Sequence, residues 1–425
     1  MPRVAFHTFG CRLNQSETAA LSHRFEDAGF AVSDETGQAD IVVVNTCTVT
    51  ENGDADTRRL VSRLVRANPD VAIALIGCQA QIQQGALLEW PNVKWVVGSA
   101  HKMALADMVI TYPEGVLDVQ KPTRASFSVG ISAVDPHHTR ANLKVQDGCD
   151  FYCSFCVIPF ARGPARSRIL EDILLDANRL VEAGHPELVI TGVNMGTYAD
   201  NGRRLTDVVG ALLGLPGVGR LRLSSIEPTT VDDAIIEWMA THPAMCRYLH
   251  LPIQSGSDAI LSAMARKYRV ADVASFLEGV VARVPGVGLG TDVLVGFPGE
   301  TDAQFDETVD TLRTLPFHYF HVFPYSKRVG TRAYKLGDPV SSGVIKKRGA
   351  ILRELSERKR MAYRVGQLGR EVRVVLEREG EGGWWGVTDE FVRVLVGGVG
   401  GVPSSRMGVA RLVRVEGDIT HAIWK

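Results

Sequence analysis

The chain has 425 residues, of which 45% are hydrophobic and 22% charged. This composition excludes bulk disorder and is typical of a globular protein with two or three domains. A formal net charge of −1 gives no overall sign of nucleic-acid binding, so any RNA contact has to come from a local patch. No apolar run approaches the ~20 residues that span a bilayer, and seven cysteines fit a reducing compartment better than a disulfide framework. We therefore expect a cytoplasmic protein without a membrane partner.

Near the N-terminus, three short β-branched or apolar runs predict strands of a parallel sheet with helices between them. These runs are residues 4–8, 41–45 and 71–76. Each strand leads into a cysteine, and these are Cys11, Cys47 and Cys78. Because ligands bind at the carboxyl edge of open α/β sheets, we expect the three thiols to converge there on a metal. The alternative is that they are ordinary buried cysteines.

A second group of cysteines follows a predicted strand at residues 142–146. Cys149, Cys153 and Cys156 have C-x3-C-x2-C spacing, with no fourth cysteine nearby. An iron-sulfur cluster held by three thiolates keeps one iron open, and that iron can bind and activate a small molecule. The alternative is a zinc site with a fourth ligand from His137 or His138, although C-x3-C is an unusual spacing for zinc. The isolated Cys246 is expected in the core.

Strand-like and helix-like segments alternate after this loop. Helical periodicity covers residues 169–182 and 302–315, and strands are expected at residues 187–192, 220–225, 248–252, 288–295 and 317–323. The pattern predicts a βα-repeat domain whose cluster loop lies at the carboxyl-end face of the strands.

The C-terminal part changes character from about residue 341. Residues 345–364 predict a basic helix, which is either a solvated face or a surface for an RNA backbone. Short strands expected at residues 371–377, 385–388, 392–396 and 410–415 then indicate a small β-barrel.

Several segments of the chain together resemble the radical-SAM methylthiotransferases, in which SAM is S-adenosylmethionine. They are residues 6–18, 45–50, 76–78, 148–168, 250–257, 264–268 and 296–301. The resemblance implies an N-terminal open parallel α/β domain at residues 1–105 and a partial (βα)6 radical-SAM barrel at 135–365. It further implies a TRAM-like RNA-binding β-barrel at 366–425.

The same resemblance implies two 4Fe-4S clusters and SAM as cofactors. Cys149, Cys153 and Cys156 would hold the SAM-binding cluster, and Cys11, Cys47 and Cys78 would hold an auxiliary cluster. Candidate SAM contacts at the strand ends are Gly192, Asn194, Ser225, Glu227 and Gln254.

Within the family, the forms of residues 45–50 and 162–168 are most similar to the class that modifies N6-threonylcarbamoyladenosine. The implied reaction adds a methylthio group to C2 of that nucleoside at tRNA position 37, with SAM as methyl donor and radical source. The implied partners are a tRNA anticodon loop, whose unstacked bases suit recognition, and a flavodoxin- or ferredoxin-like electron donor. The sequence leaves the sulfur source open.

Four alternatives remain at this point. The same reaction could act on N6-isopentenyladenosine or on an aspartate of a ribosomal protein. The chain could instead be a zinc-containing, non-catalytic RNA-binding protein, or a radical-SAM enzyme whose second cluster only transfers electrons.

Overall fold

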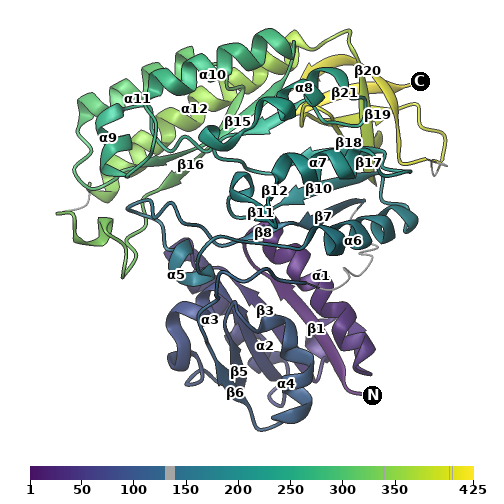
Figure 1. Cartoon of the computed structure of the whole chain (residues 1–425), viewed down its shortest axis with the longest axis vertical. Coiled ribbons are helices and arrows are strands. Elements are labelled where there is room, and N and C mark those ends of the chain that lie inside the picture. Colours follow the sequence, from purple (N-terminus) through teal and green to yellow (C-terminus); the bar gives the residue numbers. More distant parts are fainter. Residues whose placement is uncertain (130–138, 338–339, 402, 404) are drawn as a thin grey trace.

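A computed structural model of the chain describes residues 1–129, 139–337, 340–401, 403 and 405–425. His137 and His138, the zinc ligands of one alternative, lie outside these residues. Figure 1 shows an N-terminal α/β part at one end, a larger βα part above it, and a small β-barrel beside the latter. None of the described helices is both long and apolar enough to cross a membrane.

The N-terminal part is a six-stranded parallel sheet covered by helices on both faces. Its strands, in the order β2-β1-β3-β4-β5-β6, are β1 (Arg3–Thr8), β2 (Ala31–Ser33), β3 (Ile41–Thr46), β4 (Ala72–Gly77), β5 (Val93–Val97) and β6 (Val116–Asp118). Its helices are α1 (Arg12–Asp27), α2 (Glu51–Ala67), α3 (Cys78–Gln83) and α4 (Leu105–Thr111), with 3-10 turns η1 (Thr36–Gln38), η2 (Gln84–Leu87) and η3 (Lys102–Ala104).

Side chains of successive strand residues point to opposite faces of this sheet, which divides its core in two. Val43 packs with α1 and α4 on one face, whereas Val42 and Val44 pack with α2 and α3 on the other. β3 and β4 are therefore buried on both sides, as parallel strands are, whereas full burial in β1 is limited to Val4 and Ala5.

The central part is a partial barrel of six parallel strands. They are β7 (Arg140–Lys144), β10 (Glu187–Thr191), β13 (Arg220–Leu223), β14 (Tyr248–His250), β15 (Gly288–Val295) and β16 (Tyr319–Pro324). They form two sheets, β13-β10-β7 and β14-β15-β16, joined by the parallel bridges Leu221–Met245 and Ser225–His250. One hydrophobic core runs through both sheets. The predicted radical-SAM type of barrel is thus confirmed.

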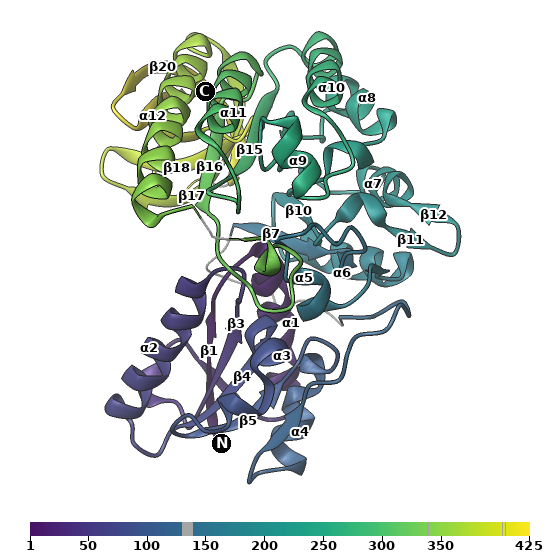
Figure 2. The ribbon, with the colours of Figure 1, turned by 90° about the vertical axis from the view of Figure 1, so that its left-hand side faces the viewer.

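Helices surround this barrel on its outer side, except α5 (Ile158–Arg162), which packs against α3 of the N-terminal part (Figure 2). The others are α6 (Leu170–Glu182), α7 (Leu205–Leu213), α8 (Asp233–Thr241), α9 (Asp258–Ala263), α10 (Val270–Arg283), α11 (Asp302–Thr314) and α12 (Ser342–Gly366). The remaining short elements are β8 (Gln146–Asp147), β9 (Arg166–Ser167), β11 (Ala199–Asp200), β12 (Arg203–Arg204), η4 (Met195–Thr197), η5 (Pro228–Thr230) and η6 (Ala333–Lys335).

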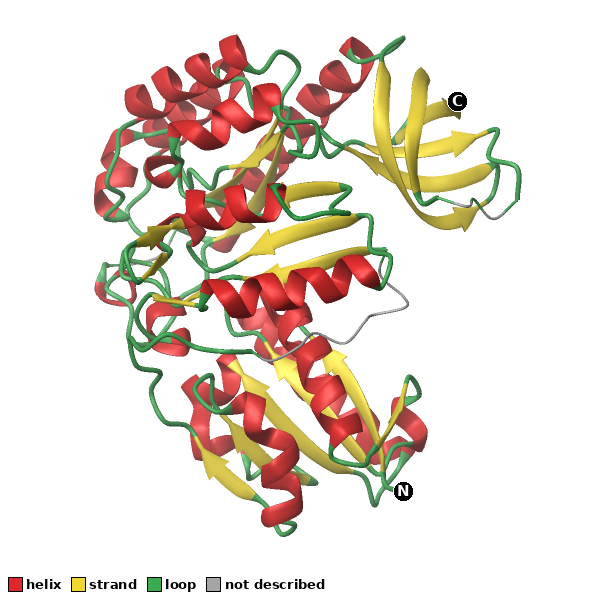
Figure 3. Cartoon of the chain, turned by 45° about the vertical axis from the view of Figure 1, so that its right-hand side comes forward, coloured by secondary structure: helices red, strands yellow, loops and turns green. Residues whose placement is uncertain are grey.

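The C-terminal part is a closed five-stranded barrel, seen at the upper right of Figure 3. Its strands, in the order β17-β18-β19-β21-β20, are β17 (Glu371–Gly380), β18 (Gly383–Thr388), β19 (Arg393–Gly397), β20 (Met407–Glu416) and β21 (Ile419–Trp424). The small β-barrel predicted from the sequence is confirmed, with β21 as an additional strand. Trp384 lies in its core.

Buried arginines on β13 attach this barrel to the central part. Arg220 donates to the Val387 carbonyl at 2.9 Å, and Arg222 donates to the Thr388 carbonyl at 2.8 Å. Both guanidiniums also pair with Glu187. Burial alone would raise the pKa of Glu187, but the two guanidiniums outweigh it and hold this pKa well below its usual range.

The basic helix α12 uses several of its charges for packing. Arg348 donates to Glu300 at 2.6 Å, Lys359 donates to the Leu315 carbonyl at 2.7 Å, and Arg364 donates to the Gly417 carbonyl at 3.0 Å. The exposed basic residues of this helix are Lys346, Lys347, Arg353 and Arg358. Fewer charges are thus available to an RNA than the sequence pattern indicates.

Candidate functional site

The first three cysteines lie at the carboxyl edge of the N-terminal sheet. Cys11 precedes α1, Cys47 follows β3, and Cys78 begins α3 directly after β4. Gly10 has φ +95°, and a Cβ there would lie 2.8 Å from the Cβ of Cys47. The loop before Cys11 therefore lies against Cys47, as close as a glycine permits.

The electrostatics of these thiols fit a shared metal centre. Burial, together with the neighbouring Cys78 and Cys11, raises the pKa of Cys47 to about 11. Burial also raises the pKa of Cys78, and the nearby Arg162 and Lys102 oppose this shift. Thiols that disfavour each other's ionisation become thiolates readily only when a cation binds among them. The iron ions of an iron-sulfur cluster would supply that positive charge.

The second group of cysteines shows the same arrangement in the loop before α5. Burial, with Cys153 and Cys149 nearby, raises the pKa of Cys156 to about 12. Arg266 Nη1 lies 3.3 Å from the Sγ of Cys153, and Asn194 Nδ2 lies 3.9 Å from the Sγ of Cys149. Donors of this kind suit thiolate ligands of a cluster, whose properties depend on hydrogen bonds to sulfur.

Cys246 is buried among arginines at the barrel interface, away from both groups of cysteines in the chain. Burial raises its pKa to about 12, opposed by Arg222 and Arg220. Neither group of three thus acquires a fourth cysteine, and each would leave one iron of a 4Fe-4S cluster open.

The five candidate SAM contacts lie at the carboxyl ends of barrel strands, on the side of the second cysteine group. Gly192 and Ser225 line a cavity, and Asn194 faces Cys149. Gln254 has φ +71° and pairs with β15. Glu227 differs from the other candidates because its carboxylate is already occupied. Both of its oxygens accept hydrogen bonds of 2.7 Å from Arg266.

Two residues at this face were not singled out from the sequence. Gln146 Oε1 accepts from the backbone N–H groups of Val193 and Asn194, at 3.0 and 2.8 Å, and so fixes the loop after β10. Arg266 bridges Glu227 and Cys153. Arg266 lies within residues 264–268, one of the segments that resemble the methylthiotransferase family. Its position in that motif could have identified it as a candidate site residue.

A cavity of about 810 Å³ joins all three parts of the chain. The N-terminal part contributes Cys11 and Arg12 to the lining of the cavity. The central, six-stranded barrel contributes Gly192 and Ser225, among others. The C-terminal barrel contributes Glu377, Arg378 and Phe391. The cavity therefore connects a cysteine of the first group with the strand ends where the SAM candidates lie.

One wall of this cavity carries a carboxylate between two histidines. Asp292 Oδ1 lies 3.0 Å from His250 Nε2 and 3.1 Å from His321 Nδ1. Burial would raise the pKa of Asp292, but the two histidine hydrogen bonds outweigh it and lower this pKa. The carboxylate is therefore ionised, and its Oδ1 atom lies within hydrogen-bond distance of a nitrogen of each histidine ring.

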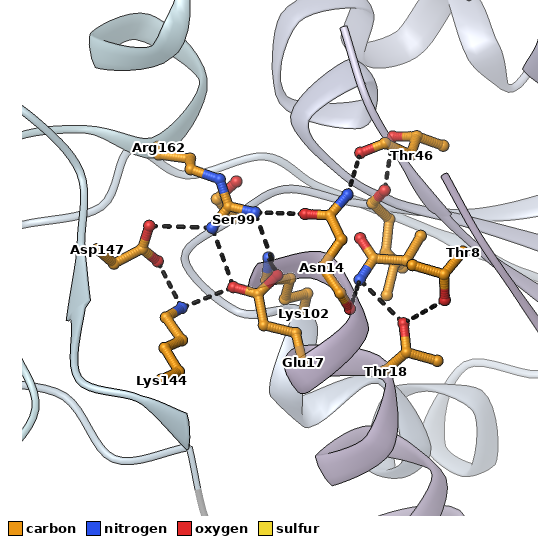
Figure 4. Close-up of polar contacts among 12 residues, drawn as sticks. Thr8, Asn14, Glu17, Thr18, Thr46, Ser99, Lys102, Lys144, Asp147 and Arg162 are labelled. Carbon is orange, nitrogen blue, oxygen red and sulfur yellow. Dashed lines mark hydrogen bonds and ion pairs between the residues drawn. The ribbon is translucent and has the colours of Figure 1, made fainter. Parts of the chain in front are cut away.

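A buried ionic network fixes the N-terminal part against the barrel (Figure 4). Glu17 of α1 accepts from Lys144 at 2.6 Å and from Arg162 at 3.0 Å, and it also pairs with Lys102. Asp147 accepts from Lys144 at 2.7 Å and from Arg162 at 3.0 Å. These five side chains are almost completely buried, so the two parts meet in one defined geometry.

The network carries more cationic than anionic groups beside the first cysteine group. Burial lowers the pKa of Lys102 to about 8, and Glu17 opposes this shift. The pKa of Arg162 lies well above its usual range because Glu17, Cys78 and Asp147 outweigh burial. A 4Fe-4S cluster bound by three thiolates is anionic overall, so the surrounding positive charge matches it.

Comparisons with known proteins agree with this arrangement. Residues 3–98 match a family described as "Uncharacterized protein family UPF0004", and residues 143–312 match the Radical SAM superfamily. The threonylcarbamoyladenosine tRNA methylthiotransferase MtaB of Bacillus subtilis is 37% identical over 413 residues, covering 94% of this chain and 91% of that protein. The tRNA-2-methylthio-N(6)-dimethylallyladenosine synthase of a Parafrankia species is 34% identical, covering 88% and 78%.

A solved structure also shares the fold. The radical SAM methyltransferase TsrM from Kitasatospora setae matches with a TM-score of 0.58 at 16% identity, covering 76% of this chain and 73% of that one. Both the radical-SAM superfamily match and the full-length relatives accord with SAM and two 4Fe-4S clusters as the cofactors. The chain belongs to the radical-SAM methylthiotransferase family that modifies tRNA.

Proposed function

We propose that this enzyme adds a methylthio group to C2 of N6-threonylcarbamoyladenosine at position 37 of tRNA. The observation that carries the proposal is the cavity shared by the three parts of the chain, which brings Cys11 to the strand ends of the barrel. The substrate is supported by relatives named threonylcarbamoyladenosine tRNA methylthiotransferase, which are 32–37% identical over most of the chain.

In this proposal each group of cysteines holds one cluster. Cys149, Cys153 and Cys156 hold the SAM-binding cluster, and Cys11, Cys47 and Cys78 hold the auxiliary cluster. When bound, these groups supply the radical and the sulfur for a reaction at an unactivated aromatic C–H bond, which side chains alone do not achieve. Among the SAM candidates, Asn194 is oriented by Gln146 beside Cys149.

The three described parts give the proposed division of labour. The N-terminal part, whose sheet extends to Asp118, carries the auxiliary cluster; the barrel carries SAM; and the C-terminal barrel borders the cavity and contacts tRNA. An unpaired anticodon-loop base enters the cavity, and a flavodoxin- or ferredoxin-like protein delivers the electron. A cytoplasmic location fits a tRNA substrate and is part of this proposal.

The test is nucleoside mass spectrometry of tRNA after anaerobic incubation with reconstituted enzyme, SAM and a reductant. We expect a methylthio gain on threonylcarbamoyladenosine with wild-type protein and none with Cys153→Ala. A gain on isopentenyladenosine alone, or on a ribosomal protein, would contradict the proposed substrate while preserving the reaction.

A further inference from the structure

Three guanidinium groups surround one aromatic ring at the wall of the shared cavity. Arg12, Arg140 and Arg222 lie 5.5, 5.9 and 5.3 Å from the ring centre of Phe391. Arg12 and Arg140 both line the cavity, and each comes from a different part of the chain than Phe391. Like charges held so close repel one another unless anions balance them.

The partners of these three groups are unequal. Arg222 pairs with Glu187, and Arg140 Nε donates to Glu377 at 2.7 Å. Nη1 of Arg140 forms an ion pair with Glu187 Oε1 at 3.6 Å, but this buried donor has no hydrogen-bond partner in the described part of the chain. Arg12 is half-buried, and no carboxylate among the described residues pairs with it.

Within the described residues, Arg12 therefore presents a positive charge to the cavity without a paired carboxylate, and Arg140 adds a buried N–H donor without an acceptor. Burying a charge or a donor without a partner is costly, so such an arrangement points to a ligand that supplies an anion. Guanidinium groups match carboxylates in shape as well as charge.

We propose that Arg12, assisted by Arg140, forms a carboxylate-binding subsite that reads the N6 substituent of the substrate base. The inference rests on the proposed function. A threonylcarbamoyl group carries an α-carboxylate, whereas an isopentenyl group carries no charge, so this subsite would favour the former. The adenine ring itself carries no anionic group for this subsite to bind. Arg12 therefore recognises the N6 substituent and is a specificity-determining residue.

A phosphate of the RNA backbone is the other source of an anion here. The two sources differ in one respect, because every stem-loop has the same phosphates but only one has the carboxylate. Binding should therefore be compared between anticodon stem-loops that carry threonylcarbamoyladenosine and its neutral N-methylamide. Affinities are measured by fluorescence anisotropy with the reconstituted full-length enzyme.

We expect the wild-type enzyme to prefer the carboxylate stem-loop by ~10-fold or more, which corresponds to ~1.4 kcal/mol. Arg12→Gln should remove this preference. Its affinity for the neutral amide should stay within about twofold of the wild-type value, a smaller change than the loss of one hydrogen bond to a charged group would cause. Arg12→Lys should restore part of the preference. The matched control is Arg3→Gln, at the exposed, opposite end of the same sheet, and we expect it to change neither affinity.

Two results would overturn the inference: an equal loss for both stem-loops, which is the signature of a phosphate contact, or a preference that survives Arg12→Gln. Because Arg12 follows Cys11, iron content is measured for each variant. If Arg12→Gln loses iron, Arg140→Gln provides the same comparison. The preference is measured without turnover, so a failure of the proposed methylthiolation is seen separately, as missing product in the wild-type enzyme.

Discussion

A Cys78→Ala enzyme is expected to cleave SAM to 5'-deoxyadenosine but to form no methylthio nucleoside. Cys78 belongs to the N-terminal group of thiols, in which neighbouring cysteines raise the pKa values of Cys47 and Cys78, whereas the pKa of Cys156 is raised by Cys153 and Cys149. Removing it should therefore disable the auxiliary cluster and leave the SAM-binding one. Cys153→Ala should lose both activities, because in the proposed assignment the affected cluster is the one that cleaves SAM.

The comparison requires that two products be measured in the same reaction. These are 5'-deoxyadenosine, measured by liquid chromatography, and the modified nucleoside, measured by mass spectrometry. Cys246→Ala is the matched control. Cys246 is as buried as Cys78 but lies in neither group, so this variant should retain both products. Methylthiolation by Cys78→Ala would remove the auxiliary-cluster assignment, and loss of SAM cleavage would show that the two groups of cysteines are not independent.

The positions of the cysteines follow from local sequence patterns. Three β-branched runs form parallel strands, and the carboxyl ends of parallel strands meet at one edge of the sheet. Cys11, Cys47 and Cys78 follow these ends and therefore lie at that edge. The barrel strands were predicted on the same basis. Short or terminal strands were not: β2 and β6 have three residues each, and β21 ends one residue before the C-terminus. β2 and β6 carry too few residues for a period of two to be recognised, whereas β21 has six residues and was overlooked.

The charged groups of the site could not be predicted in this way. Glu17 and Arg162 are 145 residues apart, and no periodicity relates them. Likewise, the basic residues of α12 look alike in sequence, but Arg348 is buried against Glu300 whereas Lys347 is exposed. Pairing across domains depends on tertiary contacts, which local sequence patterns do not record.

Glu17→Gln is expected to lower the free energy of unfolding by roughly 3–5 kcal/mol, the usual cost of breaking a buried ion pair on one side. Glu17 is 1% exposed, and its carboxylate serves Lys102, Lys144 and Arg162. A neutral amide would leave these cations with Asp147 alone. The pKa of Lys102, already lowered to about 8 by burial, should fall further, so that this amine loses its proton near neutral pH.

Urea unfolding followed by tryptophan fluorescence would measure the change at equal iron content. Glu114→Gln is the matched control, since Glu114 is exposed in the same part of the chain and surface substitutions usually change stability by about 0.5 kcal/mol or less. An equal loss in both variants would contradict a structural role for the network. A loss confined to Glu17→Gln would support it, and the same variant should bring the N-terminal cysteines out of their fixed position and reduce product formation.

The pH dependence offers an independent check on the same residue. Burial would raise the pKa values of Glu17 and Asp147, but the surrounding cations outweigh it and lower both values far below the usual 4.5 and 3.8. Below those usual values the unfolded chain binds more protons than the folded one, so stability must fall as the pH falls. Wild-type enzyme should therefore lose stability steeply on acidification below pH ~4.5. Glu17→Gln, with one titrating carboxylate fewer, should start lower and fall less steeply, and parallel profiles for the two proteins would mean that Glu17 is not held ionised by these cations.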